Sequence, residues 1–467
     1  MPSLRVLAVV LLVGMGASVA AVSGVANSDK SDAIVRGSQA ADPAVTPTVP
    51  PAVVPLDVRA ENRLPGTQNW QIGRARGTRG TLAGYTRVLS VRSGQQVPLS
   101  VSGDGPVRVR AMRIGWYGGV GARQVWQGTI RAQREPGDPG TWPSRGYADT
   151  TAWPEGHYLL RLDQGDASRY LPLTVRTTDN RGRAVVLTSP LTWQAENTPA
   201  APVTTAPAAL PKISFNRPYA TGFGAAGFLE HDARIVQLAE RSGLSIGYAT
   251  DDDVATDPAL LTGATAVLTG GDSQYWTSGL RTAIRSAADA GTNLAFFGAG
   301  TGARQIKVVD AGRALQISRA APSTSIKLTG LRPNCTGAST GWVVRSADWW
   351  GYRGTGLRNG SVLTGLVSDR ADRPGPATTG SLLSLTPLTC GSVPQSGLYQ
   401  VRASGAGVFT AGTGRWSCAL TGRCTDASGR GVAIDVTTQR AVTRITRNVI
   451  KSFAKAKAGA RLPVPAS

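Results

Sequence analysis

The sequence predicts a β-sandwich domain followed by an α/β domain whose sheet is mainly parallel. Its 467 residues are too many for one hydrophobic core, so two domains are expected. The first half contains short apolar runs between turn residues, which is typical of an antiparallel sandwich. From Lys212 onward, short buried runs alternate with amphipathic segments, as they do in a parallel sheet covered by helices.

The sandwich is predicted from its strands and turns. The expected strands are 87–92, 97–102, 107–114, 158–162, 170–175 and 184–188. Turn signals separate them, such as Ser93-Gly94 and Asp179-Asn180. Arg and Val alternate from Val107 to Arg113, which predicts a sheet with one face in water.

The α/β region is predicted from its change of period. The expected strands are 212–215, 244–249, 265–269 and 292–297, and the expected helices are 228–241, 278–290 and 439–456. Two stretches rich in Pro, Ala and Thr cannot form a core. The predicted organisation is therefore a signal peptide (1–27), a disordered tether (28–55), the sandwich (56–196), a linker (197–211), the α/β domain (212–458) and a tail (459–467).

The N-terminus predicts export. Arg5 precedes an apolar stretch from Leu7 to Val22, and small residues follow, so cleavage near residues 20–26 is expected. An uncleaved anchor is the alternative, because the stretch approaches the ~17–25 residues that span a bilayer. No later stretch is long and apolar enough to cross a membrane. We therefore expect a secreted or cell-surface protein.

Four cysteines fit an exported chain. An even number suggests disulfides, and four cysteines allow three pairings. We favour Cys335–Cys390 and Cys418–Cys424. A zinc site is the alternative, but the chain has no CxxC pair, and its only histidines, His157 and His231, lie far upstream.

The formal charge of +21 predicts an anionic partner. Cell-wall polymers, anionic glycans and acidic lipid headgroups are the expected classes. Nucleic acid is not expected, because export removes that target and no nucleic-acid-binding motif occurs. The abundance of Arg has a second interpretation, which is the base composition of the genome.

Candidate site residues follow three predicted strands, because ligands of open α/β sheets bind at the carboxyl ends of strands. They are Asn216, Arg217 and Tyr219 after the first strand, Asp272, Ser273, Gln274, Tyr275 and Trp276 after the second, and Gly298 after the third. A fourth candidate is the acidic run 251–253.

These segments resemble the N,N-dimethylformamidase large (beta) subunit family. Residues 216–219 are similar to its Arg-Pro-Tyr segment, and residues 270–276 to its Gly-His-Asp-Glu-Tyr-Trp stretch. Residues 293–298, 405–413 with Trp416, and 446–449 resemble its later segments. Residues 61–67 and 115–119 resemble the β domain that precedes it in many members, so the resemblance runs from about Glu61 to Ala456. It implies a flavodoxin-like or class I glutamine-amidotransferase-like sheet.

The resemblance also implies amide hydrolysis at an iron ion held by two tyrosines and one glutamate. A hard Lewis acid polarises an amide carbonyl, and phenolate and carboxylate oxygens suit such an ion. By motif position, Tyr219 and Tyr275 are the phenolates. The family's Glu has no counterpart in residues 365–370, where Asp369 is nearest, and its His-Asp-Glu is here Asp272-Ser273-Gln274. Two hypotheses follow: an exported amide hydrolase, or a decayed site that binds wall material without turnover.

Other interpretations stay open for these residues. Tyr219, Tyr275 and Trp276 are also typical of core packing. Asp272 and the run 251–253 also suit helix capping. Ser273 follows a strand as a nucleophile does, and His231 is the only candidate base that the sequence of this domain offers, although no pattern places it near Ser273. Trp349, Trp350 and Tyr352 predict either an aromatic ligand surface or core packing.

Overall fold

The computed structural model describes residues 56–77, 81–197, 212–318, 324–375, 378–425, 430–459 and 461–465. The predicted signal peptide and tether, and nearly all of the predicted linker, lie outside these ranges. The described residues all belong to one compact unit, Pro50–Ser467. None of the helices in the described part is long and apolar enough to span a membrane.

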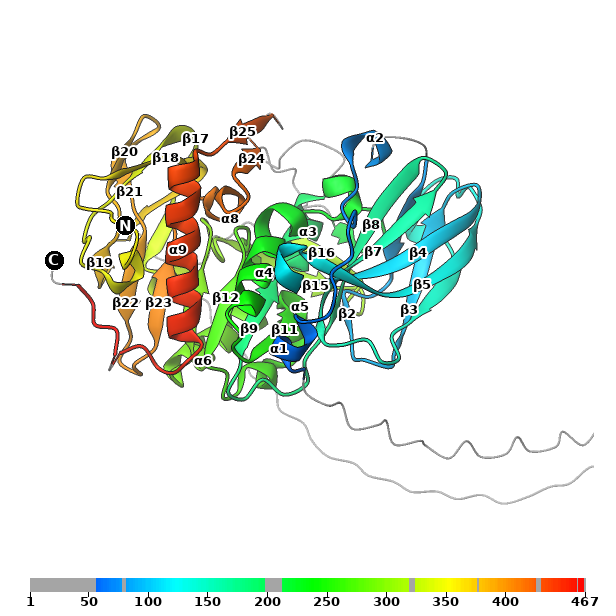
Figure 1. Ribbon diagram of the computed structural model, residues 1–467, viewed down its shortest axis with the longest axis horizontal. Helices are drawn as coiled ribbons and strands as arrows, with labels where there is room; N and C mark the ends of the chain where they lie inside the picture. The colour runs from blue at the N-terminus through cyan, green and yellow to red at the C-terminus, as the bar shows by residue number, and fades with distance from the viewer. Residues whose placement is uncertain are drawn as a thin grey trace, which may run out of the picture. The chain divides into compact units, whose positions relative to one another are not determined.

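The first region is strand-rich, as predicted (Figure 1). One sheet has the order β2 (Ser90–Val91), β8 (Ala167–Val175), β7 (Gly156–Gln164), β4 (Gly105–Ile114) and β5 (Ala122–Ala132). The other has the order β1 (Ala83–Thr86), β3 (Gln96–Ser102) and β6 (Gly146–Asp149). Leu99 of β3, Val109 of β4 and Leu160 of β7 are fully buried in one cluster, so the two sheets share a core.

The alternation along β4 ends before the strand does. Arg108 is exposed and Arg110 is half-buried, as a wet face requires, but Arg113 is fully buried. The prediction of a wet face was wrong at Arg113, because this guanidinium pairs with Glu240 from another part of the fold, at 2.9 Å. A partner distant in sequence outweighs the local pattern.

A seven-stranded sheet forms the centre of the second region. Its order is β11 (Ile246–Thr250), β9 (Ala184–Thr188), β12 (Ala266–Thr269), β14 (Asn293–Phe296), β23 (Gly407–Thr410), β22 (Leu398–Val401) and β19 (Ser381–Leu382). The first five strands pair in parallel, and the last two are antiparallel. Strand β9 thus lies between β11 and β12, although the sequence groups it with the preceding strands.

Helices cover both faces of this sheet. Val186 of β9 shares a buried cluster with α4 (Ala233–Arg241) and α9 (Val436–Phe453). The next residue, Leu187, points the other way and shares a cluster with α5 (Asp251–Thr256) and α6 (Ser278–Asp289). Because both faces are buried, these strands read as continuous apolar runs.

Smaller elements complete the described fold. A four-stranded sheet has the order β10 (Lys212–Ser214), β16 (Ala314–Ile317), β15 (Arg304–Val309) and β13 (Tyr275–Trp276). Three further sheets are strand pairs: β17 (Leu331–Val343) with β18 (Val362–Pro374), β20 (Thr386–Leu388) with β21 (Gly391–Gln395), and β24 (Arg423–Thr425) with β25 (Gly431–Ala433). The short helices are α1 (Val58–Glu61), α2 (Arg74–Gly77), α3 (Pro190–Glu196), α7 (Thr324–Thr329), α8 (Trp416–Ala419), η1 (Tyr117–Gly119), η2 (Pro139–Thr141), η3 (Gly222–Gly224), η4 (Phe228–Asp232), η5 (Pro258–Leu261) and η6 (Trp350–Tyr352).

The disulfide prediction is confirmed for Cys418–Cys424, whose Cα atoms are 5.0 Å apart. Cys390 is also disulfide-bonded, and the side chain of Cys335, its expected partner, lies outside the described residues. A zinc site on these cysteines is therefore wrong, because a thiolate ligand cannot at the same time form a disulfide.

Candidate functional site: a carboxyl pair at the strand ends

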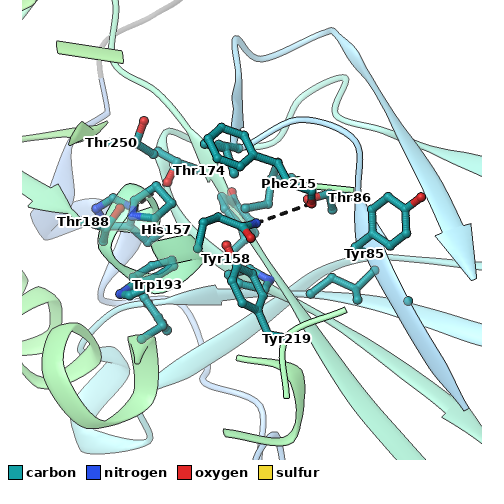
Figure 2. A pocket seen from close by; sticks show the side chains of 18 residues that line it. Tyr85, Thr86, His157, Tyr158, Thr174, Thr188, Trp193, Phe215, Tyr219 and Thr250 are labelled. Atoms are coloured by element: carbon teal, nitrogen blue, oxygen red, sulfur yellow. Dashed lines mark hydrogen bonds between the residues drawn. The ribbon is translucent and has the colours of Figure 1, made fainter. Parts of the chain in front are cut away.

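Tyr219 lines a narrow pocket and is partly buried. Its ring meets that of Trp193 edge-on, with the ring centroids 6.4 Å apart, in a pocket that Phe215 and His157 also line (Figure 2). The cavity volume is about 20 Å³. A single water needs roughly 10–15 Å³, so this space does not admit an organic substrate. Burial raises the pKa of Tyr219 well above its usual range, and the phenol is neutral at neutral pH.

Tyr275 has different neighbours. Its ring packs against a buried cluster that includes Leu191 and Ile306, and its backbone N–H donates to Thr192 Oγ1 at 3.1 Å. It does not line the cavity of Tyr219. The nearest charges also differ, because Glu196 acts on Tyr275 and Asp251 on Tyr219.

The two tyrosine side chains therefore have different neighbours among the described residues. The side chain of Asp369, the third predicted ligand, lies outside the described residues. The iron site stays a prediction from the resemblance.

A larger pocket opens at the carboxyl ends of the parallel strands. Its volume is about 580 Å³, which suits a small organic ligand. Its walls come from the end of α3, the loop 221–227, η4, the segment after β12, β18 and the loop that leads into β24. The lining residues are Trp193, Glu196, Asn197, Thr221, Gly222, Ala226, Gly227, Leu229, Glu230, His231, Asp272, Arg370, Thr421, Arg423, Cys424, Thr425 and Gly431.

Two carboxyl groups meet in this pocket. The Gln274 side-chain amide donates to Glu196 Oε1 and to Asp272 Oδ1, both at 2.9 Å. The Arg370 guanidinium spans the same pair, 3.1 Å from Glu196 and 3.2 Å from Asp272. We call these four residues the carboxyl-pair site. One amide and one guanidinium thus hold the two acids together.

The pKa values of the two carboxyl groups are shifted in opposite directions. Burial and then the charge of Asp272 raise the pKa of Glu196 to about 8. Burial opposes ionisation of Asp272 too, but Arg370 and His231 outweigh it and hold the pKa of Asp272 below its usual range. Although 38% of the Glu196 side chain is accessible, its carboxyl group is held between Gln274 and Arg370 beside the charge of Asp272. At neutral pH the pair therefore offers one proton donor and one proton acceptor.

His231 stands next to this pair. A Cβ atom on Gly271 would lie 2.9 Å from His231 Nδ1, and one on Gly227 would lie 3.1 Å from its Cδ2, so two glycines make room for the ring. Nδ1 is buried and has no hydrogen-bond partner among the described residues. The residue belongs to η4, a π-helical turn, a form that is frequent at functional sites.

The loop 221–227 is strained. Phe223 and Ala226 have φ values of 56° and 52°, which side-chain-bearing residues seldom adopt. Such conformations persist only when surrounding structure enforces them, and they gather at binding sites. Here the loop forms one wall of the pocket.

The disulfide positions another wall of the pocket. Cys424 lines the pocket, and its partner Cys418 is buried in α8. Beside it, Glu230 accepts hydrogen bonds from the backbone N–H of Thr425 at 3.2 Å and from its hydroxyl at 2.6 Å. Strand β24 is thus attached at two points.

The structure separates the other predicted site residues. Asn216 accepts from Arg313 at 2.8 Å in a different pocket, and Arg217 donates to the Gln194 carbonyl at 3.2 Å. Trp276 is fully buried in the core, as its packing interpretation predicted. A Cβ on Gly298 would lie 2.0 Å from the Gly271 carbonyl oxygen, so this glycine allows two strand ends to approach.

The capping interpretations have mixed outcomes. The run 251–253 does cap a helix, because Thr250 and Asp253 form a reciprocal capping box at the start of α5. Asp272 does not cap, since Thr277 accepts from the Leu280 N–H at the start of α6 instead. That interpretation of Asp272 was wrong because Tyr275 and Trp276 form strand β13 before the helix begins.

The serine-nucleophile and aromatic-surface interpretations lose their basis. The Ser273 hydroxyl is buried and accepts from the Trp276 indole at 3.0 Å, with no hydrogen bond to His231. Trp349 and Tyr352 are buried against Phe409 and Tyr399, so the core interpretation of these rings is confirmed.

Sequence reasoning missed Glu196 and Arg370. Glu196 is the last residue of α3, the helix that directly follows β9. The segment after the carboxyl end of a central parallel strand predicts a ligand-binding position, so the sequence did contain a signal for Glu196. That signal was lost because β9 was grouped with the sandwich. Arg370 follows Asp369, the residue chosen for its carboxylate, and only the fold reveals that the guanidinium reaches Asp272.

These observations define a strand-rich protein whose carboxyl pair lies at the carboxyl ends of parallel strands. The family is identified by its sequence: the model of the N,N-dimethylformamidase beta subunit-like, C-terminal family matches residues 108–427. The match covers more than half of the chain, and the chain belongs to this family. No curated protein matches the chain.

Proposed function

We propose that this protein hydrolyses the C–N bond of a small amide in the 580 Å³ pocket, with Glu196 as general acid and Asp272 as general base. The main observation behind this proposal is the carboxyl pair itself. The Gln274 amide donates a hydrogen bond of 2.9 Å to each of the two carboxyl groups. Family membership supports the reaction class. The opposed pKa shifts of the two groups support their roles.

The proposed reaction balances without a further reactant. The protonated Glu196 donates a hydrogen bond to the amide oxygen, and the Asp272 carboxylate takes a proton from water as the water oxygen bonds to the carbonyl carbon. The tetrahedral intermediate collapses when the proton held by Asp272 passes to its nitrogen and the C–N bond breaks, which returns Asp272 to the carboxylate. The products are a carboxylic acid and an amine. Arg370 keeps Asp272 ionised, and thus able to accept a proton, before the water attacks.

The sheet order supports a flavodoxin-like or amidotransferase-like assignment of the fold. Renumbered along the chain, β11, β9, β12, β14 and β23 have the order 2-1-3-4-5. Doubly wound sheets of this order bind ligands where the strand order reverses, beyond the carboxyl ends. Glu196 follows β9 and Asp272 follows β12, the two strands at that reversal.

We further propose that the protein acts after export, as the predicted signal peptide indicates. An even set of cysteines with a formed disulfide at the pocket wall suits an oxidising compartment. The mass of the mature N-terminus, measured on protein from the culture medium or cell surface, tests cleavage near residues 20–26.

The hydrolase proposal is tested by amine release from N,N-dimethylformamide and a panel of small N-alkyl amides. Glu196→Gln removes the acid and should lower the rate by about 10²–10⁴-fold. Asp348→Asn, an exposed acid outside the pocket, is the control and should keep the rate. Because the acid form of Glu196 is lost as the pH rises through about 8, the rate should fall above that pH.

Metal analysis separates this proposal from the iron hypothesis. Amine release that persists after chelation, and in Tyr275→Phe, supports the carboxyl pair. A rate that needs stoichiometric iron, is lost in Tyr275→Phe and survives in Glu196→Gln would refute it.

A further inference from the structure

Helix α9 carries its cations on one face. Arg440, Arg444, Arg447 and Lys451 follow one another at spacings of 4, 3 and 4 residues. Residues three and four apart are neighbours on a helix surface, so the four side chains form a continuous row. The opposite face is buried in the core through residues such as Ile445 and Val449. We call this row the α9 stripe.

The stripe has no acidic counterpart. The 18 residues of α9 include no Asp or Glu. Arg440, Arg444 and Lys451 are exposed, and none of the four cations forms an ion pair within the described ranges. Elsewhere many arginines do have such partners, as Arg110 has in Asp163, at 2.7 Å.

Helix α4 brings another cation to the same place. Arg241, at its end, lies 4.2 Å above the Trp116 ring. Burial, and then the charges of Arg241 and Arg444, lower the pKa of Arg447. The guanidinium groups are therefore close enough to repel one another.

This arrangement costs stability in the free protein. Like charges three and four residues apart on a helix are unfavourable. The helix dipole favours Lys451 in the last turn, but it does not favour Arg440 and Arg444, which lie nearer to the N-terminal end. A bound anion would remove the repulsion.

We infer that the α9 stripe, with Arg241, binds a linear polyanion, such as a phosphate-bearing cell-wall polymer. The row from Arg440 to Lys451 spans about 16 Å at 1.5 Å per residue, and successive cations lie about 4.5–6 Å apart along the axis. A flexible chain with regularly spaced phosphates can follow such a row. This binding surface is independent of the pocket and of the proposed hydrolysis.

A polymer fits this face better than a membrane surface does. Helices that lie in a bilayer interface place large apolar side chains beside their cations. Among the described residues of α9, the exposed large apolar side chain is Val436, at the first position of the helix. The stripe therefore offers charge with little apolar area to insert.

The test measures binding of the full mature protein to poly(glycerol phosphate) at several salt concentrations. The triple variant Arg440→Gln, Arg444→Gln, Lys451→Gln keeps long side chains that favour helices. The matched control is Arg63→Gln, Arg108→Gln, Arg131→Gln, which removes three exposed cations of the first region. We expect the stripe variant to bind at least about 10-fold more weakly, with a shallower salt dependence, because fewer counterions are released. The control should change affinity by less than about 2-fold.

Two outcomes would overturn the inference. Equal weakening in both variants would show that net charge, and not the stripe, attracts the polymer. Stripe-dependent binding to phosphatidylglycerol vesicles, without binding to the free polymer, would assign the face to a membrane. Thermal unfolding of both variants checks that each is folded, and the amine-release assay shows whether the pocket is unaffected.

Discussion

At the residue scale, the most consequential side chain outside the pocket is Arg113. It pairs with Glu240 at 2.9 Å, and both side chains are fully buried. It also donates to the Tyr117 and Tyr248 hydroxyls at 2.9 and 3.1 Å and to the Glu155 carbonyl at 3.0 Å. A buried charge is tolerated when it is paired and hydrogen-bonded in this way.

Glu240→Gln should lower the free energy of unfolding by about 3–5 kcal/mol, because it leaves the Arg113 charge buried and unpaired. Urea denaturation measures the change. The exposed pair of Arg134 and Asp104 is the control, and Asp104→Asn should leave the urea midpoint nearly unchanged. A midpoint in Glu240→Gln equal to that of the wild type would contradict the assignment.

His157 makes stability depend on pH. Its ring nitrogens lie 2.9 Å from Thr174 Oγ1 and 3.1 Å from the Val186 carbonyl, and burial lowers its pKa to about 4. The unfolded chain takes up its proton near pH 6.5, so between pH 6.5 and 4 it binds more protons than the folded protein. The stability that neutral His157 contributes is therefore lost as the pH falls through this window.

The comparison of wild type with His157→Gln isolates this effect. The variant should be less stable at pH 7, and the difference should shrink by up to about 3 kcal/mol by pH 4. Denaturation at several pH values measures it, and NMR titration of the imidazole gives its pKa directly. A difference that is constant with pH would rule out the buried neutral histidine.

At the scale of elements, the Cys418–Cys424 bond attaches the pocket wall to α8. It closes a loop of only a few residues, so its entropic contribution is small, about 2 kcal/mol. The double variant Cys418→Ser, Cys424→Ser should lose about that much stability and should raise KM for the amide more than it lowers kcat. Urea denaturation and amine-release kinetics measure the two effects. Unchanged KM would mean that the hydrogen bonds of Glu230 to Thr425 suffice to hold the wall.

Local sequence patterns predicted most elements because their signals are local. The apolar runs 184–188 and 265–269 are strands, and the predicted helix 439–456 is α9 with its start three residues earlier, where Asp435 accepts from the Thr438 N–H. Strand β13 was missed, because two residues paired with Arg304 and Gln305 have no periodicity to detect.

The site was predictable only in part. Asp272 and Gln274 lie at a strand end that the sequence marks, and both belong to the carboxyl-pair site. Glu196 reaches the same place from a position 78 residues before Gln274. Arg370 reaches it from strand β18, after the turn that joins β17 to β18. No spacing rule connects such distant segments, so their meeting requires the three-dimensional fold.

At the scale of the whole molecule, the two predicted regions interlock. Strand β9 follows the sandwich strand β8 in the chain but lies in the seven-stranded sheet, between β11 and β12. Arg113 of β4 reaches Glu240 of α4, and Asn62 Nδ2 donates to the same carboxylate at 3.0 Å. The boundary at residue 196 stays a prediction, but these contacts bear on how the chain unfolds.

We expect the described unit to unfold in one cooperative transition. If either region unfolded alone, the buried charge of Arg113 or Glu240 would lose its partner in the other region. Scanning calorimetry of the mature protein should give a calorimetric enthalpy close to the van't Hoff enthalpy. Glu240→Gln is the informative variant: if the ion pair couples the regions, its removal should broaden or split the transition as well as lower it. Two resolved transitions in the wild type would instead mean that each region is stable without the other, and that the buried ion pair forms between parts that are already folded.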